Sequence, residues 1–162
     1  MLDIVTYGDD VLIKKAEAVR DFGPEIEELA ASMLDAMHRG KGIGLAGPQV
    51  GRSLRIFVTH VEGDKPRAFI NPEIVLTSQD EVEYEEGCLS LPGLYLNLVR
   101  PESVRIQAWN EKGRPFTTEA GGLLARVLLH EYDHLDGVLF IDRLSPAKRD
   151  RALVQYQRLI RM

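Results

Sequence analysis

GGLLARVLLHEYDHLDG, residues 121–137, is the stretch of sequence that decides the fold. Its apolar residues recur at helical spacing, and Gly137 is a typical residue for ending a helix. Within it, HEYDH has the pattern H-E-x-x-H. Because helical residues four apart lie on one face, His130 and His134 can direct two imidazole nitrogens to one metal ion. Glu131 follows directly and can reach a water molecule bound to that metal.

Two histidines do not make a stable catalytic metal site, which usually has a third protein ligand and one open position. Beyond this motif the chain has no further histidine and no glutamate. The single cysteine, Cys88 in EEGCLSLPG, is an unused soft ligand, and its thiolate would complete a Cys-His-His set. Two alternatives stay open at this point: Cys88 as a small buried apolar residue, and His130 and His134 as ordinary surface histidines.

The rest of the chain predicts helices near both ends and strands between them. Ser145 and Pro146 suit the start of the last helix, and Asn71-Pro72 interrupts the longest strand. This order is an α+β pattern of mainly antiparallel sheets around the helix with H-E-x-x-H, in a single domain over residues 1–162. The predicted helices cover residues 9–19, 24–40, 121–137 and 145–162, and the predicted strands cover 54–60, 67–78, 104–110 and 114–120.

Composition excludes several classes of protein. The net charge of −5 makes the chain acidic overall, so we expect no DNA partner. MLDIVTYGDD lacks the basic and apolar regions of a signal peptide, and no apolar run approaches the roughly 18 residues of a membrane helix. We therefore expect a cytoplasmic protein without a membrane partner.

GIGLAG, residues 42–47, has the letters of a dinucleotide-binding turn, G-x-G-x-x-G. That fingerprint needs a strand before the glycines and a helix that opens from them. Here a helix ends before Gly42, and Pro48 and Gly51 follow, so the order is wrong. We expect these glycines to let the backbone come close to another group.

Three segments taken together resemble the signature motifs of peptide deformylases: GIGLAGPQ, EGCLSLP and HEYDHLDG, in the order of that family. The resemblance continues through FINPEI, VRIQAWNEKGRPF, GLLAR and LFIDRLSP, and thus covers essentially the whole chain. It implies an enzyme that removes the formyl group from the N-terminal formylmethionine of nascent polypeptides and releases formate.

The resemblance also implies roles for single residues. The metal would be held by Cys88, His130 and His134, while Glu131 would be the general base and acid. When water attacks the formyl carbon, the formyl oxygen becomes negatively charged. This oxyanion would be stabilised by the Gln49 side-chain amide and the Leu89 backbone N–H. The ligand set alone suggests Zn(II), whereas the resemblance implies Fe(II) in vivo, with Zn(II), Ni(II) or Co(II) able to occupy the site. Glu86 and Asp133 are candidates for orienting the ligands; alternatively they are solvated or paired charges.

The formylmethionyl peptide would lie extended against the GIGLAG segment, with main-chain hydrogen bonds as in strand addition. Core packing is the alternative role for the apolar members of this set. The substrate-binding residues expected from the resemblance are Ile43, Gly44, Tyr84, Gly87, Leu123 and Val127.

The chain departs from the family pattern at two positions. Gly47 stands where the family usually has alanine, which we expect to loosen the loop that holds Gln49. Tyr95 stands where some bacterial members have an arginine that contacts the peptide beyond methionine. Tyr95 lies in PGLYLNL, residues 92–98, an apolar stretch that predicts either a peptide-binding rim or a homodimer contact.

The C-terminal segment is rich in arginine and lysine. It predicts either an amphipathic helix with a solvated basic face or a helix that docks on the ribosome.

Two other functions compete with the deformylase interpretation. An H-E-x-x-H peptidase leaves Gln49, Gly44 and the C-L-S segment without a role, and a binding module with a structural metal would normally close the site with four protein ligands.

Overall fold

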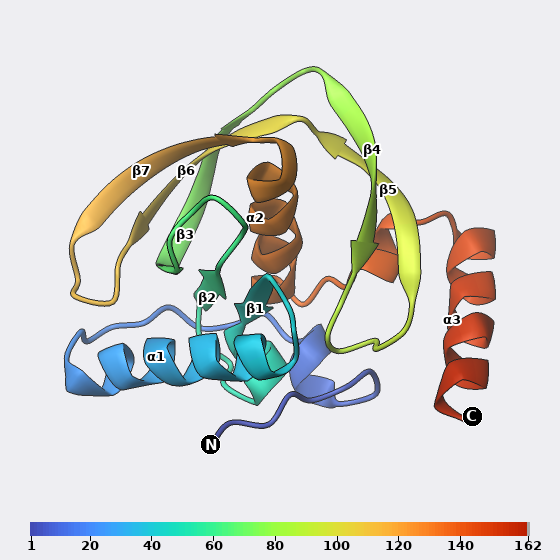
Figure 1. The fold of residues 1–162 in the computed structure, drawn as a ribbon, viewed down its shortest axis with the longest axis horizontal. Helices are drawn as coiled ribbons and strands as arrows, with labels where there is room; N and C mark the ends of the chain where they lie inside the picture. The colour runs from blue at the N-terminus through green and yellow to red at the C-terminus, as the bar shows by residue number, and fades with distance from the viewer. Residues whose placement is uncertain (162) are drawn as a thin grey trace.

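A central helix, α2, lies between a five-stranded antiparallel sheet and a two-stranded ribbon in the computed structural model, which describes residues 1–161 (Figure 1). The sheet has the strand order β1-β2-β3-β6-β7. Its strands are β1 Gly44–Ala46, β2 Ile56–Thr59, β3 Arg67–Thr77, β6 Ser103–Trp109 and β7 Pro115–Gly121, and the ribbon consists of β4 Glu81–Gly87 and β5 Tyr95–Pro101. The helices are α1 Pro24–Arg39, α2 Gly122–Leu135 and α3 Pro146–Ile160, with the 3-10 helices η1 Asp10–Ile13, η2 Gly47–Val50 and η3 Phe140–Arg143.

Helix α2 is buried on almost every side. Leu128 and Ala125 pack with Phe57, Phe69 and Ile106 of the sheet in one core cluster. The opposite side of the helix, which bears the histidines, is covered by the ribbon (Figure 1). No helix within residues 1–161 is long and apolar enough to cross a membrane. The α+β architecture and the predicted helix with H-E-x-x-H are confirmed.

Helix α1 begins at Pro24, as predicted, and its apolar face packs on β1 and β2. The predicted helix over residues 9–19 is wrong beyond Ile13. From there the chain is extended, because its backbone bonds to other segments: Ala16 N donates to Leu135 O (2.8 Å) and Glu17 N to Ser53 O (2.9 Å). These long-range hydrogen bonds outweigh the local helical pattern.

The ribbon β4–β5 was not predicted as strands. Its inward face holds Glu86 and Arg100, so the usual alternation of apolar and polar residues is missing from this pair of strands. In β5, Leu96 and Leu98 lie on the inward face and Tyr95 on the outward one. Burial therefore accounts for much of the apolar content of PGLYLNL.

Asn71 lies at the predicted break in the longest strand. The strand continues through it as β3, but its pairing with β6 shifts between Ile70 and Glu73. Asn71 has a positive φ of 49°, and its side chain bonds both backbone groups of Val19, at 2.8 and 2.9 Å. The break is thus an irregularity that anchors the segment before α1.

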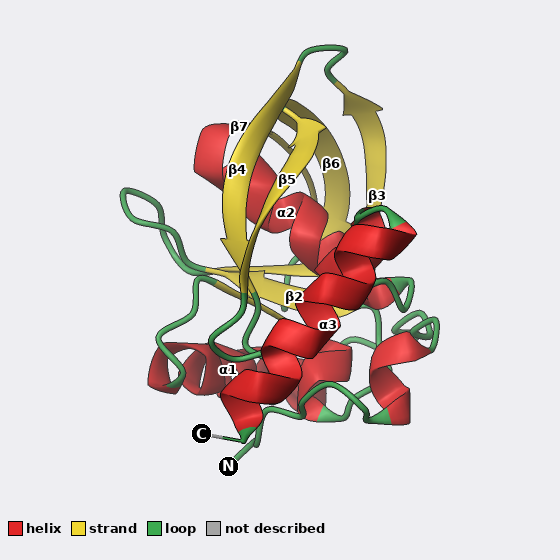
Figure 2. Ribbon diagram, turned by 90° about the vertical axis from the view of Figure 1, so that its right-hand side faces the viewer, coloured by secondary structure: helices red, strands yellow, loops and turns green. Residues whose placement is uncertain are grey.

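Helix α3 forms as predicted, with the Ser145 hydroxyl accepting a hydrogen bond from Lys148 N. Ala152 and Tyr156 are its buried residues, and they join a core cluster with Leu94 and Leu98 of the neighbouring segment and ribbon. Figure 2 shows α3 crossing the side of the molecule next to β4 and β5. The C-terminal helix therefore supports the ribbon from outside.

Three glycines of GIGLAGPQ lie where a side chain would collide with a neighbour. A Cβ at Gly44 would come within 2.6 Å of Glu131 Oε2, and one at Gly42 within 2.7 Å of Leu89 Cδ1. A Cβ at Gly47 would lie 2.7 Å from the backbone oxygens of Arg52 and Leu54. Two carbonyls fill the space beside Gly47, so the backbone here has no room for an alanine side chain. That Gly47 loosens the loop stays a prediction.

We expect Gly47→Ala to lower the free energy of unfolding by about 1–3 kcal/mol, the usual cost of overpacking, because backbone must move to admit the methyl group. Urea denaturation measures this change. Gly121→Ala is the matched control, since its nearest contact would be Glu102 O at 4.0 Å. Equal stability of the two variants would contradict the packing argument.

Candidate active site

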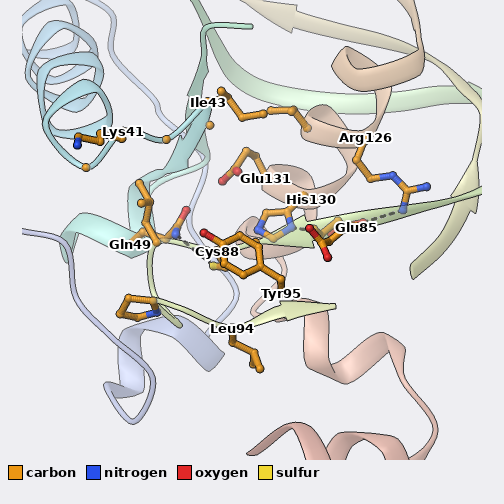
Figure 3. A pocket seen from close by; sticks show the side chains of 18 of the residues that line it. Lys41, Ile43, Gln49, Glu85, Cys88, Leu94, Tyr95, Arg126, His130 and Glu131 are labelled. Atoms are coloured by element: carbon orange, nitrogen blue, oxygen red, sulfur yellow. Dashed lines mark hydrogen bonds and ion pairs between the residues drawn. The ribbon is translucent and has the colours of Figure 1, made fainter. Parts of the chain in front are cut away.

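A pocket of about 530 Å³ opens between β1, the end of β4 and the face of α2 (Figure 3). It is lined by the loop 40–44 with Gln49, by residues 85–89 and 92–95, and by Leu123, Arg126, Val127, His130 and Glu131 of α2. All three segments that carried the family resemblance contribute to it. Segments far apart in the sequence therefore meet in one cavity.

Cys88 and His130 line this pocket, and His134 lies beside them. All three are buried, and their ligand atoms lie within 4.8 Å of one another. Cys88 Sγ is 3.4 Å from His134 Nε2. The cysteine follows β4 and the histidines lie one turn apart on α2, so packing the ribbon on the helix creates the group. Surface histidines do not fit this arrangement, because His130 and His134 are buried. Cys88 also packs in an apolar core cluster, so its role as a ligand stays a prediction.

Glu86 orients His130. Its Oε1 lies 2.8 Å from His130 Nδ1, which leaves the Nε2 of that ring for another partner. Glu86 also accepts hydrogen bonds from Arg100 at 2.6 and 3.1 Å and from Arg126 at 2.7 Å. Asp133 accepts from Arg100 (2.9 Å) and from Arg143 (3.0 and 2.6 Å). Glu86 and Asp133 thus belong to a buried charge network.

The sequence analysis missed Arg100 and Arg126. Both are nearly fully buried, at 6% and 4% exposure, which is rare for arginine without an ionic partner. Arg126 also donates to the carbonyls of Leu98 and Val82, at 2.9 and 2.7 Å. One signal in the sequence pointed to Arg126: it is the last residue of GLLAR, where the neighbouring residues of the helix are apolar.

The network controls the charges around the histidines. Burial would raise the pKa of Glu86, but hydrogen bonds from His130 and Arg100 hold it well below its ordinary value. Burial lowers the pKa of His134 well below its ordinary value, which favours the neutral imidazole with a free lone pair for a metal.

Glu131 is buried beside the metal-ligand group, as we call Cys88, His130 and His134. Its Oε1 has no hydrogen-bond partner within residues 1–161. Burial raises the pKa of Glu131 to about 7. A carboxyl group with such a pKa can take up and release a proton near neutral pH. Figure 3 shows Glu131 directed into the pocket beside His130.

Gln49 reaches the same place from the opposite wall (Figure 3). Its Oε1 accepts from Ala46 N at 3.0 Å, and its Nε2 lies 3.6 Å from Cys88 Sγ. Leu89 lines the pocket, and its backbone N–H has no hydrogen-bond acceptor in the described chain. Two N–H donors thus lie next to the metal-ligand group.

Most of the predicted substrate-binding residues line the pocket. Ile43 and Leu123 are 41% and 47% exposed at its mouth, and Gly44, Gly87 and Val127 lie among its lining residues. Strand β1 pairs with β2 along one edge only, so its other edge is free beside α2.

Tyr84 is the exception among these residues, since it lies outside the pocket lining. Its ring lies against the guanidinium of Arg126, 5.3 Å from ring centroid to Cζ. Tyr95 does line the pocket, where its ring covers Gly87 so closely that a Cβ there would lie 2.7 Å from it. The aromatic residue at this rim is therefore Tyr95.

The donor set fits a divalent transition metal. A thiolate and two imidazoles suit zinc and iron, and the group offers three protein ligands with the cavity on its open side. Burial, and the fixing of His130 by Glu86, favour ligand atoms held in place for an ion. A closed structural site with four protein ligands is not formed by the described residues.

Comparison with known proteins agrees with this geometry. The family model for polypeptide deformylase matches residues 1–150. The chain belongs to the polypeptide deformylase family. It is similar to peptide deformylases of Clostridium botulinum (50% identity; 88% of this chain and 96% of the relative) and Treponema pallidum (42%; 98% and 97%). The crystal structure of a peptide deformylase from Legionella pneumophila has a TM-score of 0.93 at 40% identity, over 99% of this chain and 96% of that one.

The predicted family is thus confirmed, and with it the class of reaction. A peptide deformylase is a hydrolase that removes the N-formyl group from nascent peptides. Peptide deformylases are metalloenzymes, and the Cys-His-His group of this chain could hold the ion. The competing interpretations as a peptidase or a non-enzymatic binding module are therefore set aside.

Glu86→Gln should lower the free energy of unfolding at pH 7 by about 3–5 kcal/mol, because it leaves buried arginines without their carboxylate. Because the folded pKa of Glu86 is depressed, its stabilising contribution is present above its ordinary pKa of 4.5 and is lost as the pH falls below that value. Urea denaturation at several pH values should show wild type and variant converging in acid.

The control for that experiment is Glu83→Gln, on the exposed face of the same strand. We expect it to have little effect on stability at any pH. A stability difference between Glu86→Gln and wild type that does not change between neutral and acid pH would contradict the role given to the network.

Proposed function

We propose that this chain, acting as a single catalytic domain, deformylates N-formylmethionyl peptides with one divalent metal ion held by Cys88, His130 and His134. The observation that carries the proposal is the burial of these three ligands beside an unpartnered Glu131 carboxylate oxygen, under the free edge of β1. The family resemblance favours Fe(II) in vivo, while the ligand set also suits Zn(II), Ni(II) or Co(II).

A divalent ion bound there supplies a water molecule of lowered pKa and polarises the formyl carbonyl. Glu131 is the proton carrier of the reaction. Its carboxylate accepts a proton as the water attacks the formyl carbon, and the carboxylic acid then donates a proton to the departing amine. Burial raises the pKa of Glu131, which favours its holding the proton between the two halves of this transfer.

The oxyanion that develops on the formyl oxygen needs donors that are already in position. We assign this role to the Gln49 side-chain N–H and the Leu89 backbone N–H. Gln49 is only 1% exposed and its amide is anchored through Ala46 N, so it would not need to reorganise. The Leu89 N–H has no competing acceptor in the described chain.

The substrate would add as a short strand to the free edge of β1, with Ile43 and Gly44 providing backbone hydrogen bonds. Gly44 permits this because no side chain separates β1 from Glu131. The methionine side chain would occupy the apolar wall of Leu123 and Val127 on α2, and Gly87 would border the peptide on the opposite side. Tyr95 rather than Tyr84 is the aromatic residue placed to contact the following residues.

Glu131→Gln tests the proton-transfer role. We expect kcat for formate release from formyl-Met-Ala to fall by about 10²–10⁴-fold, the usual contribution of general acid–base catalysis, because the amide cannot accept the proton. The assay is run on anaerobically prepared protein, with bound metal measured on the same samples. Metal content should stay near one ion per chain.

The matched control is Glu85→Gln, which changes the same kind of group in the same pocket at an exposed position. It should keep most of the activity. Full activity in Glu131→Gln would overturn the assigned mechanism, and absence of formate release from metal-loaded wild type would overturn the proposed substrate.

We further propose that α3 docks on the ribosome through ribosomal RNA. Its buried side holds Ala152 and Tyr156. The exposed side carries Lys148, Arg151, Arg158 and Arg161, none of which is in an ion pair within residues 1–161. Such a row of unpaired cations favours a polyanionic partner.

The homodimer expected from the apolar stretch PGLYLNL stays a prediction.

Reversing two of these charges, with Arg151→Glu and Arg158→Glu together, should reduce co-sedimentation with ribosomes and weaken its dependence on salt. The control is Arg20→Glu with Arg114→Glu, which alters two exposed arginines near the α1 and β6–β7 end of the molecule, away from α3 (Figure 1). Equal co-sedimentation of both double variants would refute docking through α3.

A further inference from the structure

Ser90 is a completely buried hydroxyl whose role the deformylase mechanism leaves open. Its exposed fraction is 0%, and it lies two residues after Cys88. Its Oγ donates to the backbone carbonyl of Val5 at 2.8 Å and accepts from Gln49 Nε2 at 3.2 Å. The side chain therefore connects the N-terminal segment to the amide that faces the metal-ligand group.

These contacts determine which way the Gln49 amide points. A hydroxyl has one proton, and the Val5 carbonyl can only accept it, so Ser90 Oγ can only accept from Gln49. The Gln49 atom facing Ser90 must then be the NH₂ group. At the other end, Ala46 N can only donate, at 3.0 Å, so the atom facing it must be the amide oxygen. Both ends fix the same orientation.

The N-terminal segment holds this arrangement from behind. Val5 N donates to the backbone carbonyl of Gln49, and Tyr7 N donates to the backbone carbonyl of Ser90, both at 2.8 Å. Residues 5–7 thus connect the loop of Gln49 with the loop of Cys88 and Ser90. The separation between the two loops sets where the second N–H of the Gln49 amide points, on the side of Cys88 Sγ at 3.6 Å.

We propose that Ser90 is a positioning residue for Gln49, supported by residues 5–7. The hydroxyl takes one N–H of the amide and thereby directs the other toward the oxyanion. This inference rests on the proposed function, in which Gln49 is an oxyanion donor. Ser90 is not among the residues that line the pocket, so it would act only through Gln49.

Ser90→Ala should lower kcat for formyl-Met-Ala by about tenfold, less than the 10²–10³-fold expected for loss of the whole donor in Gln49→Ala, because the amide stays but can rotate. KM and bound metal per chain should not change. The double variant should be no slower than Gln49→Ala alone, since Ser90 acts only through that amide. Ser90→Thr, which keeps the hydroxyl, should recover most of the rate.

Thr59→Val is the matched control. Thr59 Oγ1 is also fully buried but has no hydrogen-bond partner within residues 1–161, so removing it should leave kcat unchanged. Unchanged kcat in Ser90→Ala, losses that multiply in the double variant, or a loss that follows lost metal would each overturn the inference. Full activity of Gln49→Ala would instead overturn the donor role within the proposed function.

A measurement on the wild-type protein covers the case in which Ser90→Ala does not fold. In nuclear magnetic resonance spectra, the two side-chain amide protons of Gln49 should exchange slowly with solvent and lie away from the positions of free glutamine, because both ends of the group are anchored. Rapidly exchanging signals at the positions of a free glutamine would overturn the inference.

Discussion

The ion network buried between α2 and the β4–β5 ribbon is the constraint on which the rest of the structure depends. Taking Glu86 and Arg100 out of water is costly unless each finds several partners of opposite charge, and these partners come from three separate elements. The network is satisfied here by packing the β4–β5 ribbon on α2. That arrangement fixes the ring of His130 through Glu86 and brings Cys88 next to His134.

The same network explains why the ribbon could not be read from the sequence. A strand is recognised by alternating apolar and polar residues, and β4 carries glutamates on both of its faces. Only tertiary structure separates exposed Glu83 from buried Glu86. The helix prediction for residues 14–19 was wrong for a related reason, since the backbone of this segment bonds to Leu135 and Ser53, which are far away in the sequence.

Local signals were sufficient for other parts of the fold. Pro24, the Ser145-Pro146 pair and Gly137 mark helix ends that depend mainly on nearby residues, and α2 has a strong helical period. The meeting of His130 and His134 was predictable because residues four apart lie on one face of a helix. Cys88 could be grouped with these histidines because it is the single cysteine of the chain. Arg100, Arg126 and Ser90 could not be found in this way, because their importance lies in contacts between distant segments.

The pairing of the N-terminal segment with late parts of the chain has a consequence for folding. Residues 5–7 bond to Gln49 and Ser90, and Ala16 bonds to Leu135, so these segments find their partners only after later parts of the chain have been made. Closing such large loops slows folding, because entropy is lost before the contacts form. We therefore expect the pocket to form only when these distant segments have come together.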